Sequence, residues 1–345
     1  MVSLGTGVRR LARAALVVGG LMGGMAGTAA AEEAAPDTYL LRYHFEPGET
    51  LRWKVLHLGT TDTTVRGVTQ VSRCRTLSLK VWTVTDVTED AEATFTHQIA
   101  WVDASNKVSD RAEVRYDSRK DAIPPEEFAP LATTIGRTLT TATVTPRGQI
   151  RDRDSQTGSF DMGLGEILVP FPEEAIAIGS SWHVPDEIRV TKPDKTVERV
   201  KIRKTFTLRG VTDAVAELTI RTEVLTPLHE PQVKVQLLQK IPHGTIRFDM
   251  TRGQVVSRQM DWSESVVGFD GRDGAMEYLA RFTEELVPDE TGSLEEALPP
   301  DSAAPATPAT AKAVPAGPVY GPQLPKATRA AALDPLAAPV APAPR

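Results

Sequence analysis

Two stretches of this 345-residue chain repeat one another, and a repeat constrains the fold because both copies must fit the same local structure. Three pairs of segments match in the same order along the chain: residues 82–89 with 206–213, 147–150 with 252–255 and, more loosely, 47–53 with 178–182. In the first pair, three positions are identical and three are conservative. This order predicts two related β modules. The alternative is that unrelated hairpins reuse the same turn and strand residues.

Apolar and polar residues alternate with a period of two through much of residues 37–288. The clearest runs are residues 111–116, 217–224, 245–250 and 276–283. This alternation is typical of strands with one face on a core and one in water. We therefore predict a mainly β, antiparallel fold of about ten to twelve strands, in which the two modules form a curved sheet or an unclosed barrel. Two stacked β-sandwiches are the alternative.

Short reversals separate the runs, and helical signal is sparse. Residues 145–148 (Thr-Pro-Arg-Gly) fit a type I turn, and residues 251–253 repeat it without the proline. Residues 192–195 and 270–274 are further hairpin turns. Residues 124–136 begin with prolines and acids and end with glycine, which predicts a short helix, and residues 172–179 predict one more turn. The second module has no visible counterpart of residues 117–135, so we expect this insertion to cover the concave face.

The N-terminus has the features of an export signal. Arg9, Arg10 and Arg13 precede an apolar, glycine-rich stretch at residues 14–27, and small residues lead up to Ala31. The apolar stretch is shorter than the roughly 20 residues of a membrane-spanning helix. We therefore expect residues 1–31 to be a signal peptide cleaved after Ala31, which makes the protein periplasmic or extracellular with no transmembrane segment after cleavage. A retained anchor is the alternative.

The net charge and the cysteine content of the chain limit which partners it can bind and how its fold can be stabilised. Cleavage removes three basic residues and no acidic ones, which changes the formal net charge from −6 to −9. An acidic chain has no general attraction for phosphate backbones, so we expect no nucleic-acid partner. Cys74 is the only cysteine in the sequence, so no internal disulfide can form and the core must hold the fold. We expect Cys74 to be a half-buried strand residue, with a reactive thiol or an intermolecular disulfide as the alternative.

The C-terminal part of the chain has a different composition. Half of the 26 prolines follow Leu286, in a segment rich in alanine and poor in large apolar residues. Such a segment cannot bury enough surface to offset the entropy of ordering, so we predict a disordered tail at residues 289–345. The remaining boundaries that we expect are a short linker at 32–38, a first β module at 39–160 and a second at 161–288.

His97 is the most informative of the six histidines because it lies on an apolar strand face, where the second module has Ile220. The simpler interpretation is a buried histidine that is hydrogen-bonded to the backbone, and a ligand contact is the alternative. If the sheet encloses a ligand, the residues that we expect to line the site are Phe95, His97, Trp101, Leu218 and Ile220.

Other motifs indicate no catalytic, cofactor or metal site. The acidic pairs at residues 152–155 and 270–274 are interrupted by arginine and lack the alternating oxygen ligands of a calcium loop. The sequence has no Gly-x-Ser-x-Gly, no His-Glu-x-x-His and no phosphate-binding loop. We therefore expect a non-catalytic protein without cofactor or metal. The basic residues between 189 and 203 predict a solvated strand face, with a contact to anionic glycan or lipid as the alternative.

Residues 41–53, 115–118 and 171–182 resemble an uncharacterised family of exported, internally repeated β proteins from planctomycete-type bacteria. The resemblance covers most of residues 39–287 and concerns turns and strand entries. It implies export and β structure, and it brings no activity or functional residues with it.

Together these features predict a secreted or periplasmic, non-catalytic envelope protein that binds an apolar or amphipathic ligand, with a lipid or another envelope component as the partner. A structural or protein-interaction module of the envelope is the alternative, because the same apolar faces can be packed core. A hydrolase whose carboxylates meet only in the folded protein is the third. Enclosed space distinguishes the first two, since a ligand site needs roughly 300 Å³.

Overall fold

The computed structural model describes residues 37–155 and 168–287, and strands account for most of them. The strands are β1 (Thr38–Tyr39), β2 (Thr50–Val65), β3 (Val68–Val87), β4 (Ala93–Val108), β5 (Val114–Asp117), β6 (Thr138–Val144), β7 (Ile150–Ser155), β8 (Ile176–Ala177), β9 (Ser181–Thr191), β10 (Val197–Thr212), β11 (Val215–Val224), β12 (His243–Asp249), β13 (Gln254–Val267) and β14 (Ala275–Leu286). The helical elements are the 3-10 turn η1 (Glu126–Phe128), α1 (Ala129–Ala132) and α2 (Pro231–Val235). The predicted mainly β fold is confirmed. The predicted signal peptide with its cleavage site, the predicted tail and the junction between the predicted modules lie outside the described residues.

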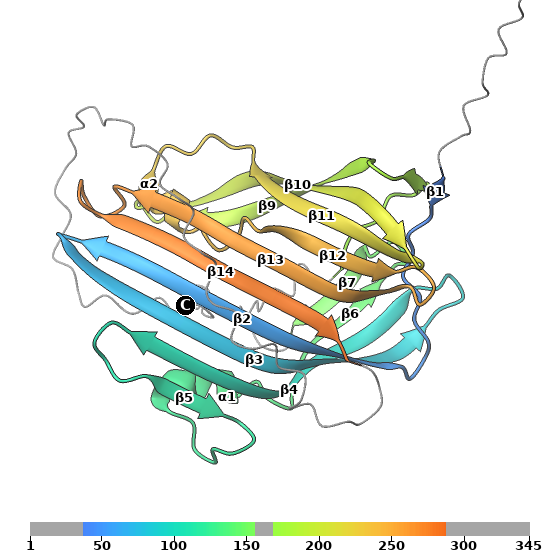
Figure 1. Cartoon of the computed structure of the whole chain (residues 1–345), viewed down its shortest axis with the longest axis horizontal. Helices are drawn as coiled ribbons and strands as arrows, with labels where there is room; N and C mark the ends of the chain where they lie inside the picture. Colours follow the sequence, from blue (N-terminus) through green and yellow to red (C-terminus); the bar gives the residue numbers. More distant parts are fainter. Residues whose placement is uncertain (1–36, 156–167, 288–345) are drawn as a thin grey trace, which may run out of the picture. The chain divides into compact units, whose positions relative to one another are not determined.

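All but two of the described strands belong to one antiparallel sheet of 12 strands, ordered β7-β6-β4-β3-β2-β14-β13-β12-β11-β10-β9 with β5 beside β4. The chain starts in the middle of this sheet, runs outward to the edge strand β7, re-enters at the opposite edge as β9 and returns, so that its last long strand pairs with its first (Figure 1). The sheet is curved and not closed into a barrel. Because it is one continuous sheet, the stacked β-sandwich alternative is wrong.

The two halves of the sheet share irregularities at matching places. We call β2, β3, β4, β6 and β7 the first strand group and β9 to β13 the second strand group. Thr85 is an extra residue in the pairing of β3 with β4, and Arg209 is an extra residue in the pairing of β10 with β11. Arg151 and Val256 are extra residues in β7 and β13, opposite the preceding strand of each group. Because a bulge redirects the strand that carries it, the two groups bend alike.

The two Arg-Gly-Gln turns, at residues 147–149 and 252–254, have the same structural role in the two strand groups. Gly148 and Gly253 have φ angles of 75° and 65°, a conformation that favours glycine. A Cβ on Gly148 would lie 2.5 Å from the carbonyl oxygen of Val169, and a Cβ on Gly253 would lie 2.4 Å from the backbone nitrogen of His44. The turns therefore need glycine because two non-strand segments, residues 41–45 and 168–171, cross them and enter the curved sheet. We call this end of the sheet the turn end and the opposite end the helical end.

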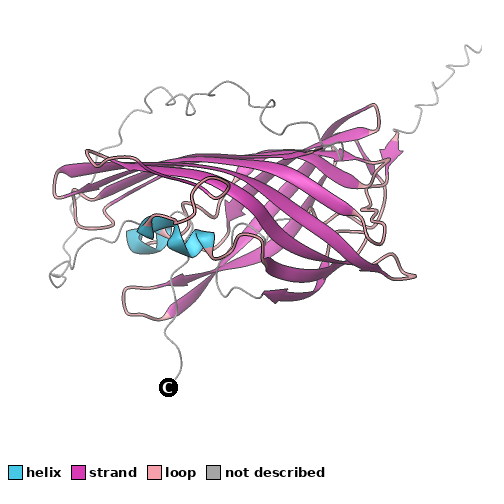
Figure 2. Ribbon diagram, turned by 90° about the horizontal axis from the view of Figure 1, so that it is seen from below, coloured by secondary structure: helices cyan, strands magenta, loops and turns pink. Residues whose placement is uncertain are grey.

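The inner face of the sheet, on which Trp82 and Phe206 lie, carries the core. At the turn end, the two crossing segments pack on it with aromatic side chains, including Tyr43 and Phe171, whose ring centroids are 5.0 Å apart. At the helical end, α1 packs on Val102 and Ala104, and α2 with the residues after it packs on Val200 and Ile202. Both helices therefore lie on the concave side, as Figure 2 shows.

Three expectations about local structure need correction. The second strand group does have a helix between its third and fourth strands, because α2 occupies the link that corresponds to η1 and α1. The first predicted helix forms but is shorter, ending at Ala132. Residues 172–179 form no helix, because Ile176 and Ala177 pair as β8 with Tyr39 and Thr38. That pairing joins residues far apart in the sequence and overrides the local helical signal.

Candidate functional site

Three of the five residues expected to line a ligand site are packed in the core. Phe95, Leu218 and Ile220 are buried on the inner face at the turn end and belong to one continuous apolar cluster. Phe95 stacks on Trp82 with ring centroids 4.3 Å apart, and its ring is tilted against that of Phe45 at 6.4 Å. Side chains interlocked at this density fill the space between the crossing segments and the sheet. They line packed protein rather than an open site.

Trp101 lies on the outer face of the sheet, away from the other four residues. Ile99 pairs with Lys80 and Trp101 pairs with Leu79, so Ala100 is an extra residue that reverses the alternation of β4. Its neighbour Val102 therefore returns to the inner face and is buried. The expectation that Trp101 shares the apolar face of Phe95 and Ile99 is wrong because strict alternation does not survive the bulge.

His97 is buried, as expected, but its environment is unusual. Its side chain is 2% exposed, and neither ring nitrogen has a hydrogen-bond partner among the residues that the structure describes. The expected hydrogen bond to the backbone is therefore not found. His97 is the cross-strand neighbour of Trp82 and of Thr140, and Trp82 Nε1 and Thr140 Oγ1 also have no partner within the described part of the chain. Burial, followed by the charges of Lys80 and Arg153, lowers the pKa of His97 to about 3.

A buried group of charges lies beside this row, where the first and last long strands pair. Lys80 of β3 forms an ion pair with Glu284 of β14, and Arg258 Nε of β13 lies 3.7 Å from the other carboxylate oxygen. The Lys80 ammonium also lies 4.4 Å from the centroid of the Trp53 ring and 4.8 Å from that of Trp82. Burial, with Arg258 adding to it, lowers the pKa of Lys80 well below its ordinary value, while the Glu284 carboxylate favours the charged form. Sequence reasoning missed this group because its members come from three distant strands.

The space next to these charges is too small for an organic ligand. A cavity of about 10 Å³ is bounded by Lys80, Trp82, Gln254, Glu284 and neighbouring apolar side chains. A volume of about 10–15 Å³ holds one water molecule, whereas drug-sized ligands occupy roughly 300 Å³ or more. The buried charges therefore face one another and a water-sized space, and no substrate fits beside them.

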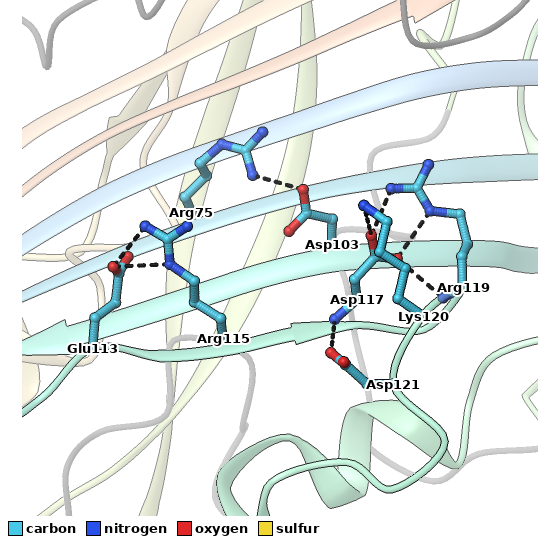
Figure 3. Close-up of polar contacts among 8 residues, drawn as sticks. All are labelled: Arg75, Asp103, Glu113, Arg115, Asp117, Arg119, Lys120 and Asp121. Atoms are coloured by element: carbon cyan, nitrogen blue, oxygen red, sulfur yellow. Dashed lines mark hydrogen bonds and ion pairs between the residues drawn. The ribbon is translucent and has the colours of Figure 1, made fainter.

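A second polar cluster lies on the outer face near β5 (Figure 3). Its cations are Arg75, Arg115, Arg119 and Lys120, and its anions are Asp103, Glu113, Asp117 and Asp121. Arg119 donates to both oxygens of Asp117 at 2.9 Å, and these hydrogen bonds are the largest cause of the lowered pKa of Asp117. Arg119 also covers Trp101, with its guanidinium carbon 4.2 Å from the ring centroid. Four positive and four negative groups cancel, so the cluster fastens the segment after β5 to the sheet and leaves no excess charge for a ligand.

Several basic side chains of the hairpin formed by β9 and β10 also pair with acidic residues of the hairpin itself or of β11. Lys192 pairs with Glu198 at 2.9 Å, Arg203 with Glu223 at 2.8 Å and Lys204 with Asp186 at 3.0 Å. Within residues 37–155 and 168–287, there is no group of three histidine, cysteine or acidic side chains that could hold a metal ion. No helix in the same ranges is long and apolar enough to cross a membrane.

Of the eight large apolar side chains that are exposed among the described residues, six lie at the two ends of the sheet, and the other two, Ile123 and Leu225, lie on connecting segments. At the helical end, Val68, Val197 and Val267 lie at the tips of three hairpins and are 72%, 64% and 74% exposed. At the turn end, Leu40, Ile150 and Ile178 lie on connecting segments or strand starts and are 43–54% exposed. The valines at the hairpin tips are more exposed than the aliphatic side chains at the turn end.

Comparison with known proteins identifies no close relative. No protein-family model matches the chain, and no curated protein matches it. Among solved structures, a lipovitellin structure concerned with lipid–protein interactions has a TM-score of 0.44 at 12% identity, covering 71% of this chain and 26% of that one. The translocator domain of the autotransporter NalP from Neisseria meningitidis has a TM-score of 0.26 at 7% identity, covering 70% of this chain and 89% of that one. Neither similarity is close enough to support an argument about this chain.

Proposed function

We propose that the protein is an exported, non-catalytic envelope protein that acts by binding an amphipathic partner at its surface, not by enclosing a ligand in its sheet. The observation that carries this proposal is the filled inner face, where Phe95, Leu218 and Ile220 are core residues. The cavity beside the buried charges measures about 10 Å³. A carrier would need roughly thirty times that volume.

The buried titratable groups support a structural role over a catalytic one. Glu284 and His97 are buried, Lys80 is 12% exposed, and Lys80 and Glu284 contact one another. A general acid or base must come within hydrogen-bonding distance of the proton that it transfers. These side chains have no room for a substrate at that distance.

Export is proposed from the basic, apolar and small-residue segments that end at Ala31. Intact-mass analysis of protein recovered from the envelope of its own cells would test it. The expected mass is that of a chain beginning at Glu32. A mass that includes Arg9 and Arg10 would contradict export by cleavage.

Native mass spectrometry of the same material tests whether the protein acts from its surface. We expect no stoichiometric lipid adduct after detergent-free purification, because the inner face has no space for one. A lipid that stays bound in a one-to-one ratio would overturn the proposal and restore an interior carrier. An apolar fluorescent probe titrated into the protein gives a second readout, and saturable one-to-one binding would have the same meaning.

A further inference from the structure

We infer that the helical end of the sheet docks on the interfacial region of a lipid bilayer through three hairpin tips that carry Val68, Val197 and Val267. This deepens the proposed function and rests on it, because it names the surface and the partner. We call these three tips, residues 65–68, 192–197 and 267–274, the valine rim.

Each tip presents its valine in a defined way. Arg66 and Gly67 have φ angles of 52° and 77°, which is the conformation of a tight two-residue hairpin turn, so Val68 follows at once and projects from the end. Lys195 has a φ angle of 68° in the turn before Val197. In the third tip, Val267 ends β13 and the backbone nitrogen of Gly268 donates to the carbonyl of Gly274 at 2.6 Å. The backbone thus holds all three valines at the end of the sheet.

The three tips are fixed relative to one another. The first is joined to the third by the pairing of β2 with β14, in which Thr64 faces Ala275. The second is held by Gln236, just after α2, which accepts from the Thr191 backbone nitrogen at 2.8 Å and donates to its carbonyl at 2.7 Å. Leu238 of the same segment packs on Val266 and Met276 beneath the third tip. The segment formed by α2 and the residues up to Leu238 therefore connects the second tip to the third. The pairing of β2 with β14 connects the first tip to the third.

The spacing of the valines favours a bilayer over a protein as the partner. β3 and β13 are separated by two strands, β2 and β14, which pair up to the tips, so Val68 lies on the order of 15 Å from Val267 along the sheet. Protein interfaces bury a contiguous apolar centre, and polar loops separate these three side chains. A bilayer interface accepts separate apolar side chains at one level, as it does the apolar face of an interfacial helix.

The charge of the valine rim predicts which lipids are needed for binding. The basic residues of the tips are Arg66, Lys192, Lys195 and Arg272, and the acidic ones are Asp194, Asp270 and Asp273. Four against three leaves a net charge of +1, so attraction to anionic lipid contributes little. Insertion of the valines must then supply most of the binding. We expect zwitterionic phosphatidylcholine vesicles to bind the protein and high salt to leave the binding nearly unchanged.

Vesicle flotation of the full mature chain tests the inference. The rim variant is V68S/V197S/V267S, and the matched control is L40S/I150S/I178S, which removes three exposed aliphatic side chains at the turn end. Each valine removed should weaken partitioning by roughly tenfold, so the triple rim variant should lose on the order of 1000-fold and stay at the bottom of the gradient. The control should float like the unaltered protein. Circular dichroism and melting curves of both variants establish that they are folded.

A second pair of variants gives a positive signal. Val68→Trp should be quenched by brominated phosphatidylcholine, whereas Ile178→Trp at the opposite end should show only the quenching of the unaltered protein. Failure of the unaltered chain to float, equal loss in both triple variants, or equal quenching of both tryptophans would overturn the inference. Binding that needs anionic lipid and disappears in salt would also overturn it. Absence of flotation together with absence of a lipid adduct would leave the proposed function intact with a different partner.

Discussion

In the first strand group, the inner-face row that begins at Trp82 continues through His97 to Thr140, whereas the matching row of the second group is Phe206, Ile220 and Gly244. Both rows cross three strands in the same register and lie next to matching bulges. The first presents three buried polar side chains whose indole nitrogen, ring nitrogens and hydroxyl have no hydrogen-bond partner among the described residues. The second presents none. The same backbone geometry therefore accommodates buried polar side chains in one group and apolar side chains in the other. We expect this difference to change the free energy of unfolding.

Lysine occupies a matching position two residues before each row, and here too the groups differ. Lys80 pairs with Glu284, which is buried, while Lys204 pairs with Asp186, whose side chain is 49% exposed. The first pair joins β3 to the last strand and crosses the seam where the chain closes its sheet. The second pair lies at the edge, between β9 and β10. Desolvation makes the loss of one partner costly in the first case and cheap in the second.

The largest expected effect is the loss of the seam pair. Glu284→Ala leaves Lys80 and Arg258 buried without the carboxylate, and this should lower the free energy of unfolding by about 3–5 kcal/mol. Asp186→Ala is the matched control and should cost less than about 1 kcal/mol, because its carboxylate is half exposed and water already weakens the ion pair. Urea denaturation of both variants measures the difference. Equal costs would show that the seam pair is not special.

Next in size are the two turns that admit the crossing segments. Gly148→Ala and Gly253→Ala each combine an unfavourable φ with a methyl group placed against backbone atoms, and each should cost about 2–4 kcal/mol. Gly67→Ala in the first hairpin tip is the control, because its φ is 77° but no atom lies within 4 Å of the added carbon. It should cost only about 1 kcal/mol. If Gly67→Ala lowered the free energy of unfolding as much as the two turn variants, contact with the crossing segments would not be the reason that these turns need glycine.

Several of these features were predictable from the sequence, and the failures have identifiable physical causes. Alternation located the long strands and their buried faces, as in Met276, Tyr278 and Ala280, because one residue in two must reach the core. It failed at Trp101, because a single extra residue reverses the face. Cys74 is half-buried on β3, as predicted. The five-residue helix α2 was missed because it is too short to show a helical period.

The candidate site was less predictable than the fold. Lys80, Arg258 and Glu284 are 178 and 26 residues apart in sequence and meet only because β14 pairs with β2. No local pattern reports a pairing between the first and last strands. The match of His97 with Ile220, by contrast, was visible in the sequence, because both follow the repeated segments at similar offsets. What the sequence could not show was that the imidazole lacks a hydrogen-bond partner.

The row comparison itself predicts a smaller change of opposite sign. His97→Ile replaces a buried imidazole by the side chain that the second group uses, and it should raise the free energy of unfolding at neutral pH by about 2 kcal/mol. Ile220→His should lower it by a similar or larger amount. Denaturation midpoints at constant m-value measure both changes. A destabilised His97→Ile would mean that the imidazole makes a favourable contact that the described residues do not account for.

The smallest effect concerns pH and isolates the titration of His97. Because its folded pKa of about 3 lies below the ordinary 6.5, the unfolded chain takes up a proton as the pH falls below 6.5 while the folded chain does not. His97 therefore destabilises the fold progressively from pH 6.5 toward pH 3, at up to about 1.4 kcal/mol per pH unit, and has no such effect above pH 7. His57, whose pKa burial lowers to about 4, acts in the same direction but is present in both chains and cancels in their difference. Between about pH 7 and about pH 5.5, the stability advantage of His97→Ile over the unaltered protein should therefore grow by about 1 kcal/mol. If the unfolding free energies of the two proteins changed in parallel over this interval, the imidazole of His97 would take up protons in the folded protein as well. The difference between the two rows would then be one of packing and not of titration.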